Sequence, residues 1–233
     1  MEIIDLSMPL YAGMPVHKSQ PPVQISVHAT HEQWDGDDDA STRTPSSLHL
    51  SMGEHTGTHV DAINHMGREY ADASIDRMSL ERFYTMGCCL DLSHKPAGTL
   101  ITEADLVLAE KRLHFPIEKG ETVLIYTDHY RRHFSSEQWA NGPGLSVEAT
   151  RWLGNRKIAA FGVETMSPGI PGLSNKAVHQ ICGELDFTHY ENLINLHLLA
   201  TRQRFRFIGL PLPIKGGTGS PVRAVAVFED NGN

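Results

Sequence analysis

The sequence predicts an α/β fold, because short apolar runs rich in Val, Ile and Leu recur between segments of helical pattern. Strand candidates outnumber helix candidates and follow no regular βαβ rhythm, so a doubly wound sheet is not predicted. The predicted strands are Glu2–Leu6, Val23–Ala29, Ser47–Met52, Cys88–Leu92, Thr122–Thr127, Ile158–Val163, Phe205–Leu210 and Val222–Phe228. The predicted helices are Leu80–Thr85, Glu103–Leu113, Val147–Leu153 and a stretch around Tyr190–Leu199.

A length of 233 residues fits one large domain or two small ones, at roughly 100–200 residues per domain. No segment has the composition of a linker, so we predict a single domain over residues 1–233. Thr102 followed by Asp105 predicts a capping box at the start of the second helix. The polar stretch 32–47 is predicted to be one long surface loop, because its three consecutive aspartates lack the spacing of a calcium-binding loop.

Charge and cysteine content exclude several classes of protein. The net charge is −8 and the basic residues form no cluster, which argues against a nucleic-acid partner. The three cysteines are too few and too irregular for a disulfide framework. We expect no leader sequence from the opening residues, and no apolar run of roughly 20 residues is present. We therefore expect a cytoplasmic protein that acts on a small molecule, with no membrane partner.

Histidines are concentrated in one short segment. The chain has 14 histidines, and residues 55–65 read His-Thr-Gly-Thr-His-Val-Asp-Ala-Ile-Asn-His. Two imidazoles and a carboxylate within seven residues, from His55, His59 and Asp61, form a ligand set suited to Zn²⁺, Mn²⁺ or Fe²⁺. The alternative is a group of unrelated packing histidines, which the concentration of three histidines and an aspartate disfavours.

Geometry constrains how this segment can hold a metal. A helix is not predicted, because Gly57 lies between two threonines and is a poor helix residue. In an extended chain His55 and His59 would lie about 13 Å apart, at roughly 3.3 Å per residue. Ligands of one ion must converge, so the chain is expected to bend at Gly57.

Three protein ligands leave an open position on the metal. A water there would have its pKa lowered to near 7 on Zn²⁺, which supplies hydroxide to attack a carbonyl. His65 lies four residues after Asp61, and we assign it as general base toward this water and then as general acid toward the leaving group. A role as fourth ligand remains the alternative.

The pattern His-x-Gly-Thr-His-x-Asp-x-x-x-His resembles the signature of the cyclase-like metal-dependent hydrolases, the family of bacterial kynurenine formamidases and isatin hydrolases. The opening segment at 6–10 and the Gly-Ser-Pro-Val-Arg-Ala run at 219–224 are also similar. The resemblance implies an α/β, barrel-like sheet with flanking helices, assembled as a homodimer or homotetramer. This chain departs from the family at Ile63, where relatives usually have proline, and in its longer 32–47 loop.

The resemblance also implies two further metal ligands in the second half of the chain, a His and a Glu about a dozen residues apart. His179 and Glu191 match this pattern, and with Asp61 as a bridge they would complete a site for one or two ions of Zn or Mn. From the residues alone, Glu191 has another explanation, since it follows Thr188 by three residues as in a capping box.

These observations predict a metal-dependent hydrolase of a small amide. The resemblance implies an arylformamide such as N-formylkynurenine, or a cyclic amide such as isatin, as the substrate type. The alternatives are a cyclase or dehydratase that acts on a carbonyl metabolite, and a non-catalytic metal-binding protein. A serine hydrolase is disfavoured, because the chain has no Gly-x-Ser-x-Gly motif.

Overall fold

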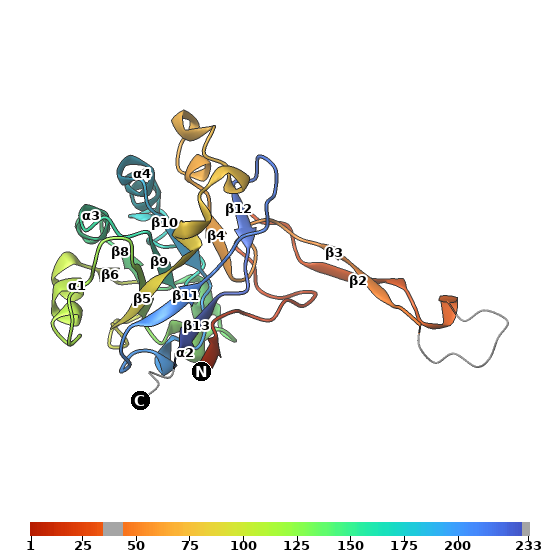
Figure 1. Ribbon diagram of the computed structural model, residues 1–233, viewed down its shortest axis with the longest axis horizontal. Coiled ribbons are helices and arrows are strands. Elements are labelled where there is room, and N and C mark those ends of the chain that lie inside the picture. Colours follow the sequence, from red (N-terminus) through yellow and green to blue (C-terminus); the bar gives the residue numbers. More distant parts are fainter. Residues whose placement is uncertain (35–43, 230–233) are drawn as a thin grey trace.

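A nine-stranded mixed β-sheet organises the computed structural model, which describes residues 1–34 and 44–229. The sheet has the strand order β1-β13-β11-β5-β7-β9-β10-β4-β12 and curls into a half-barrel (Figure 1). Its strands are β1 (Glu2–Asp5), β4 (His59–Asp61), β5 (Tyr84–Asp91), β7 (Thr122–Tyr126), β9 (Ala160–Val163), β10 (Thr188–Glu191), β11 (Phe205–Ile208), β12 (Gly219–Pro221) and β13 (Val225–Phe228).

The centre of the sheet is parallel and its two sides are antiparallel. Strands β5, β7, β9 and β10 run parallel, whereas β11, β13 and β1 continue the sheet antiparallel on one side. On the other side β4 pairs antiparallel with both β10 and β12. All five residues of β7 are buried, as expected for a central strand with both faces covered.

Helices cover one face of the parallel strands (Figure 1). They are α1 (Glu103–Glu110), α3 (Val147–Asn155) and α4 (Asn175–Leu185), while the short α2 (His129–His133) lies elsewhere. Strand alternation divides the core into two layers. Cys88 and Leu90 of β5 pack in the layer beneath the helices, and Cys89 packs in the layer on the opposite face.

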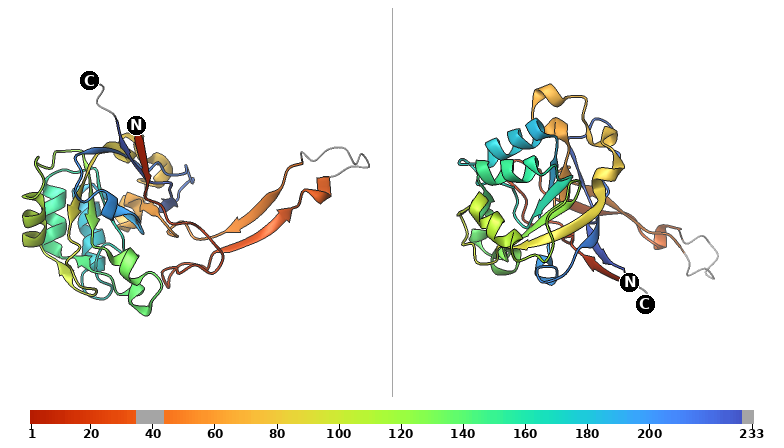
Figure 2. Two further views of the ribbon diagram at one scale, coloured as in Figure 1. Left: turned by 90° about the horizontal axis from the view of Figure 1, so that it is seen from below. Right: turned by 60° about the vertical axis from the view of Figure 1, so that its left-hand side comes forward.

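Two small sheets complete the described strands. One pairs β6 (Leu100–Ile101) with β8 (Gly144–Leu145), and the other pairs β2 (Gln24–Ala29) with β3 (Ser47–Ser51). The β2–β3 ribbon, called the arm below, projects away from the body of the molecule (Figures 1 and 2). Short 3-10 turns span Glu32–Trp34, Ile63–His65, Arg68–Tyr70, Ile75–Arg77, Leu80–Phe83, Glu137–Ala140 and Leu196–Leu198.

The α/β class predicted from the sequence is confirmed, and so is the capping box that joins Thr102 and Asp105 at α1. The helix predicted around Tyr190–Leu199 is wrong. Its first residues belong to β10, which pairs with β9 and β4, and only Leu196–Leu198 form a turn. Pairing on both sides of this segment overrides its apolar periodicity, because each backbone group gains a partner in the sheet.

Other elements also differ from the sequence-based expectation. Leu80–Thr85 is a 3-10 turn that runs into β5 rather than a helix. Strands β4, β10 and β12 were not predicted, because three or four residues are too few to show a period. The 11-residue helix α4 was not predicted either. Of the predicted loop at 32–47, residues 35–43 lie outside the described part of the chain, and β3 begins at Ser47.

The described part of the chain has free thiols and no helix that could span a membrane. Cys88, Cys89 and Cys182 are buried free thiols, as expected for a chain without a disulfide framework. Across the described ranges, every helix is too short or too polar to cross a lipid bilayer.

Candidate metal centre

Two neighbouring strands bring four possible ligands to one face of the sheet. His59 and Asp61 alternate along β4, and His189 and Glu191 alternate along β10, so all four side chains project from the same face. The register places Glu191 directly opposite His59. His59 Nε2 lies 3.4 Å from Glu191 Oε2, and His189 Nε2 lies 3.2 Å from Asp61 Oδ2.

The bend expected between His55 and His59 is present at Gly57. Gly57 has a φ of +63°, in the left-handed region that glycine adopts readily. A Cβ atom at this position would lie 2.7 Å from the Cδ2 atom of Leu10. The bend returns His55 to the cluster, where its Nδ1 atom is 2.7 Å from Asp61 Oδ1.

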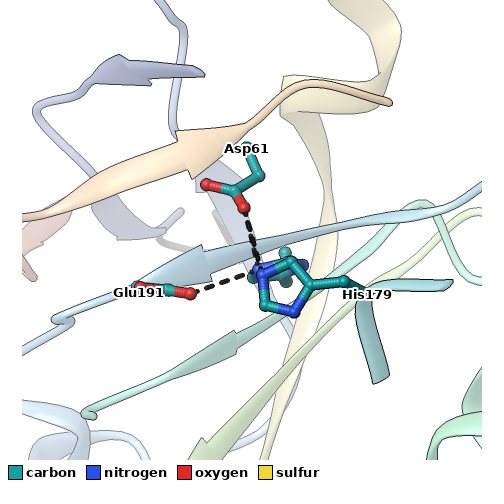
Figure 3. Close-up of side chains that lie close together, drawn as sticks. Asp61, His179 and Glu191 are labelled. Atoms are coloured by element: carbon teal, nitrogen blue, oxygen red, sulfur yellow. Dashed lines mark ion pairs between the residues drawn. The ribbon is translucent and has the colours of Figure 1, made fainter. Parts of the chain in front are cut away.

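Helix α4 contributes His179 from above the sheet. Its Nε2 atom lies 3.6 Å from Asp61 Oδ2, and Figure 3 shows Asp61, His179 and Glu191 pointing toward one another. The Nδ1 atom of His179 donates to the carbonyl of Asn175 at 2.8 Å, and that of His59 donates to the carbonyl of Gly57 at 2.8 Å. These hydrogen bonds fix the tautomers, so that Nε2 of each ring is free to bind a metal.

The ligands fall into two groups that share Asp61. Nitrogen and oxygen atoms of His55, His59 and Asp61 lie within 4.8 Å of one another, and so do those of Asp61, His179, His189 and Glu191. Sharing of one carboxylate between two groups is what a bridged two-ion site requires. Imidazole and carboxylate donors suit zinc or manganese.

Unsatisfied polar atoms support the fit of a cation. Asp61 Oδ2 and both ring nitrogens of His189 are buried and have no hydrogen-bond partner among the described residues. A buried polar group without a partner costs about 1–3 kcal/mol. A metal ion among these atoms would remove that cost.

The tautomer of His55 gives a second test of the fit. The Thr218 hydroxyl donates its proton to Glu54 Oε1 at 2.5 Å, so it accepts from His55 Nε2 at 2.8 Å. Nδ1 of a neutral His55 therefore carries a lone pair, which faces Asp61 Oδ1 at 2.7 Å. The lone pairs of these two atoms repel each other at this distance unless a cation, either a proton or a metal ion, is bound between or beside the two atoms.

The charges and hydrogen bonds around Asp61 keep its carboxylate ionised, as a metal ligand must be. Burial alone would raise the pKa of Asp61, but the surrounding rings of His189, His179 and His55 outweigh it and hold that pKa well below its usual range. Burial alone would lower the pKa of His189. The neighbouring Asp61 carboxylate outweighs burial and raises that pKa well above its usual range. Protons and a metal ion compete for the same nitrogen atoms, so metal affinity should fall at low pH.

Comparison with known proteins identifies the family. The Cyclase family model, described as putative cyclase, matches residues 4–169. This chain belongs to the Cyclase family. The isatin hydrolase of Roseibium aggregatum is 29% identical over 199 residues, which cover 76% of this chain and 73% of that protein. A kynurenine formamidase of Bacillus cereus is 25% identical over 233 residues and 96% of each chain.

A solved structure shares the fold along nearly the whole chain. Isatin hydrolase A from Ralstonia solanacearum superposes with a TM-score of 0.83 at 29% identity, covering 98% of this chain and 92% of that one. The Cyclase family match contains the 55–65 motif but ends at residue 169, before His179 and Glu191. The second half of the cluster therefore rests on the geometry described above.

His65 lies beside the ligands rather than among them. It ends the turn after β4, its Nε2 atom is 3.7 Å from Asp61 Oδ2, and its side chain is 37% exposed. Its ring centroid is 4.3 Å from that of His55. Burial lowers the pKa of His65, and the neighbouring histidines lower it further while Asp61 opposes them. Outside both ligand groups, His65 keeps a neutral ring that can accept a proton at neutral pH.

Sequence reasoning missed His189. The signal was an alternating pair, since His189-Tyr-Glu191 repeats the His59-Val-Asp61 pattern of one imidazole and one carboxylate two residues apart. The capping-box explanation of Glu191 is wrong, because Thr188–Glu191 form a strand. The Thr188 hydroxyl instead donates to the backbone carbonyl of Asp61 at 2.5 Å.

Another cavity, of about 630 Å³, lies away from this cluster. It is lined by the end of α1 and by residues 200–204, and contains none of the clustered ligands. Its Arg202 is already paired with Glu2, and its Arg204 with Glu121. Size alone therefore does not make it the reactive site.

Proposed function

We propose that this chain is a metal-dependent hydrolase of a small amide. The observation that carries the proposal is the convergence of four histidines and a second carboxylate, that of Glu191, around the shared Asp61. The relatives named isatin hydrolase and kynurenine formamidase support a carbon–nitrogen bond as the target. An arylformamide such as N-formylkynurenine, or a cyclic amide such as isatin, is the proposed type of substrate.

The residues that would hold one or two ions of zinc or manganese are His55, His59, Asp61, His179 and Glu191, together with His189. When bound, the metal supplies polarisation of the substrate carbonyl and an activated water. The remaining contributions come from the protein. Hydrogen bonds at His55, His59 and His179 orient these rings before the metal arrives, which limits the reorganisation that binding requires.

His65 moves the proton in the proposed reaction. Its neutral ring takes a proton from the attacking water and then delivers that proton to the departing nitrogen of the amide. The ring is partly exposed in the cavity above the ligands, so a substrate can reach it. Asp61 lies close enough to stabilise the imidazolium that forms between the two transfers.

A panel of formamides and lactams, assayed with and without a chelator, tests the proposal. A hydrolase should cleave at least one member, lose activity with the chelator and regain it on addition of Zn²⁺ or Mn²⁺. Water addition or loss without cleavage of a carbon–nitrogen bond would indicate the cyclase or dehydratase alternative. Metal binding without turnover of any member would indicate a non-catalytic protein.

We further propose that the chain assembles as a homodimer or homotetramer through the arm. Cross-strand pairs place Ile25, Val27, Leu48 and Leu50 on one face of the ribbon, and the opposite face is polar. Val27 and Leu48 are 63% and 66% exposed. A two-stranded ribbon is only marginally stable alone in water, so burial of this apolar face against a second copy would stabilise it.

A further inference from the structure

A turn near the end of the chain lies against the metal ligand His55. Residues 214–219 read Ile-Lys-Gly-Gly-Thr-Gly and lead into β12, which pairs with β4 so that Gly219 lies opposite Asp61. A Cβ atom at Gly219 would lie 2.7 Å from Cε1 of the His55 ring. The absence of a side chain therefore makes room for the ring, and the turn is close enough to hold it.

The turn is fixed by contacts that do not involve His55. Gly216 has a φ of +72°, which glycine adopts readily, and its amide donates to Asp76 Oδ1 at 2.9 Å. The Ala62 amide donates to the Thr218 carbonyl at 2.8 Å. The backbone of Thr218 is thus held in place independently of the ring that its side chain contacts.

His55 faces the cluster with the opposite ring nitrogen from its neighbours. In His59 and His179, Nδ1 donates to a backbone carbonyl and Nε2 faces the other ligands. In His55, Nε2 lies 2.8 Å from the Thr218 hydroxyl and Nδ1 lies 2.7 Å from Asp61 Oδ1. A neutral His55 can therefore bind a metal through Nδ1 only while its proton is kept on Nε2.

Glu54 decides where this proton lies. One carboxylate oxygen of Glu54 accepts from the Thr218 amide at 3.0 Å, and the other accepts from the Thr218 hydroxyl at 2.5 Å. A hydroxyl has a single proton, so a hydroxyl that donates to Glu54 can only accept from His55 Nε2. Glu54 Oε1 lies 4.0 Å from His55 Nε2, too far for a direct hydrogen bond, so the Thr218 hydroxyl is the link.

Glu54 and Thr218 lie outside the cavity above the ligands. That cavity is lined by His55 but by neither of these two residues. Glu54 also belongs to neither group of clustered ligand atoms. Both residues therefore act on the ligand ring rather than on a metal or a substrate, which makes them positioning residues.

We propose that Glu54, acting through the Thr218 hydroxyl, directs the Nδ1 lone pair of His55 toward the metal. This inference rests on the metal site of the proposed function and adds a positioning pair to it. Its effect is on the ion that His55, His59 and Asp61 would hold, because His55 belongs only to that ligand group.

Thr218→Val tests the link by removing the hydroxyl at nearly constant size. The affinity for one ion should fall roughly 10–100-fold, the loss typical when the partner of a metal ligand is substituted. Thr218→Ser keeps the hydroxyl and should restore most of that affinity. Thr201→Val, at an exposed threonine outside the cluster, is the matched control. Zn²⁺ binding to the metal-free protein is measured by calorimetry, and melting temperatures establish that each variant is folded.

Glu54→Gln tests the direction of the hydrogen bonds. The Thr218 amide can only donate, so it takes the oxygen of the new side-chain amide and leaves the NH₂ group facing the Thr218 hydroxyl. That hydroxyl then donates its own proton to His55 Nε2, which leaves the ring proton on Nδ1. Affinity for the same ion should fall as in Thr218→Val, although the volume of the side chain is unchanged. Glu148→Gln, at an exposed position of α3, is the control.

The double variant of Thr218→Val and Glu54→Gln separates this role from a general loss of structure. Glu54 acts only through the hydroxyl, so the double variant should bind Zn²⁺ no more weakly than Thr218→Val alone. Additive losses in the two single variants would overturn the proposed link.

The protonated nitrogen of each ring gives a direct readout in the Zn²⁺-loaded protein. Nitrogen-15 spectra of the histidine side chains distinguish Nδ1–H from Nε2–H. His55 should carry its proton on Nε2, whereas His59 and His179 should carry theirs on Nδ1. A proton on Nδ1 of His55 in the loaded protein would overturn the inference.

Metal binding and turnover together distinguish failure of this inference from failure of the proposed function. If Zn²⁺ binding depends on Glu54 and Thr218 as stated but no amide is cleaved, the positioning pair stands and the hydrolase proposal falls. If amides are cleaved while Thr218→Val and Glu54→Gln bind every ion as tightly as the wild type, the pair is overturned and the hydrolase remains. A wild type that binds no divalent metal would overturn both.

Discussion

Glu191 faces His59 across the β10–β4 pair, with its Oε2 atom 3.4 Å from His59 Nε2. One step along the same strands, Asp61 and His189 form a second pair at 3.2 Å. Imidazole and carboxylate thus alternate around a square on one sheet face. Substitution of His59 or Glu191 is therefore expected to change metal content, whereas substitution of His65, which lies beside these four residues, is expected to change catalysis.

His59→Ala should lower metal content severely. The wild type is expected to hold roughly one to two equivalents of divalent metal, and this variant reduces the His55, His59, Asp61 group to two ligands. Elemental analysis of the purified protein measures the change. His94→Ala, an exposed histidine outside the cluster, is the control. A His59→Ala protein with wild-type metal content would show that the ligand assignment is wrong.

Glu191→Gln should lower metal content while leaving the fold intact. The amide matches the carboxylate in size but is a poor ligand, and Glu191 holds no helix end whose cap could be lost. We expect a lower number of bound equivalents and an unchanged melting temperature of the metal-free protein. Glu184→Gln, an exposed position on α4, controls for the substitution itself. Equal metal content in both variants would remove Glu191 from the site.

His65→Ala should keep metal content near that of the wild type while kcat falls by roughly 10²–10⁴. The loss should be largest for amides with poor leaving groups, since these need the proton most. The fall in kcat should be smaller for an activated ester, because its leaving group departs without needing a proton. Metal loss together with activity loss would instead make His65 a ligand. Equal loss for every substrate, with metal retained, would assign His65 mainly to water activation.

Glu164 should make the stability of the fold depend on pH. It follows β9, and its Oε2 atom accepts from the Thr127 amide and hydroxyl and from the His129 amide. Burial raises its pKa to about 7, and these hydrogen bonds only partly oppose that effect. An unfolded glutamate ionises near 4.5. Between these values unfolding releases a proton, so the free energy of unfolding should fall as pH rises from 4.5 to 7.

Glu164→Gln measures this effect, because the amide oxygen can accept the same hydrogen bonds without ionising. Relative to wild type, the variant should become more stable as the pH rises from about 5 to about 8, by at most about 3 kcal/mol. Urea unfolding at several pH values gives the difference. Glu148→Gln on the surface of α3 should follow the wild-type curve. Parallel curves for wild type and Glu164→Gln would contradict the prediction.

The apolar face of the arm is predicted to hold the oligomer together. Replacing Leu48 and Leu50 with serine removes apolar area from one face of the ribbon and should shift the protein to a smaller species in sedimentation experiments. His49→Ser, on the opposite polar face, is the matched control. A wild-type monomer, or an assembly that the double variant leaves unchanged, would contradict assembly through the arm.

The local half of the metal centre follows from the order of the amino acids alone. His55, His59 and Asp61 lie within seven residues, so their convergence requires only one bend, and Gly57 is the residue that permits it. The alternation of β4 then places His59 and Asp61 side by side without help from distant residues. The longer strands and two of the helices were also predictable, because their apolar patterns extend over enough residues to show a period.

The other half depends on how distant segments pack together. His189 and Glu191 reach Asp61 because β10 pairs antiparallel with β4, across a separation of more than a hundred residues. His179 reaches it because α4 packs on the same face of the sheet. A four-residue strand carries too little pattern to reveal its partner, since the register is set by backbone pairing and by the packing of the whole sheet. His189 is therefore recognised as a ligand candidate only from the pairing of β10 with β4.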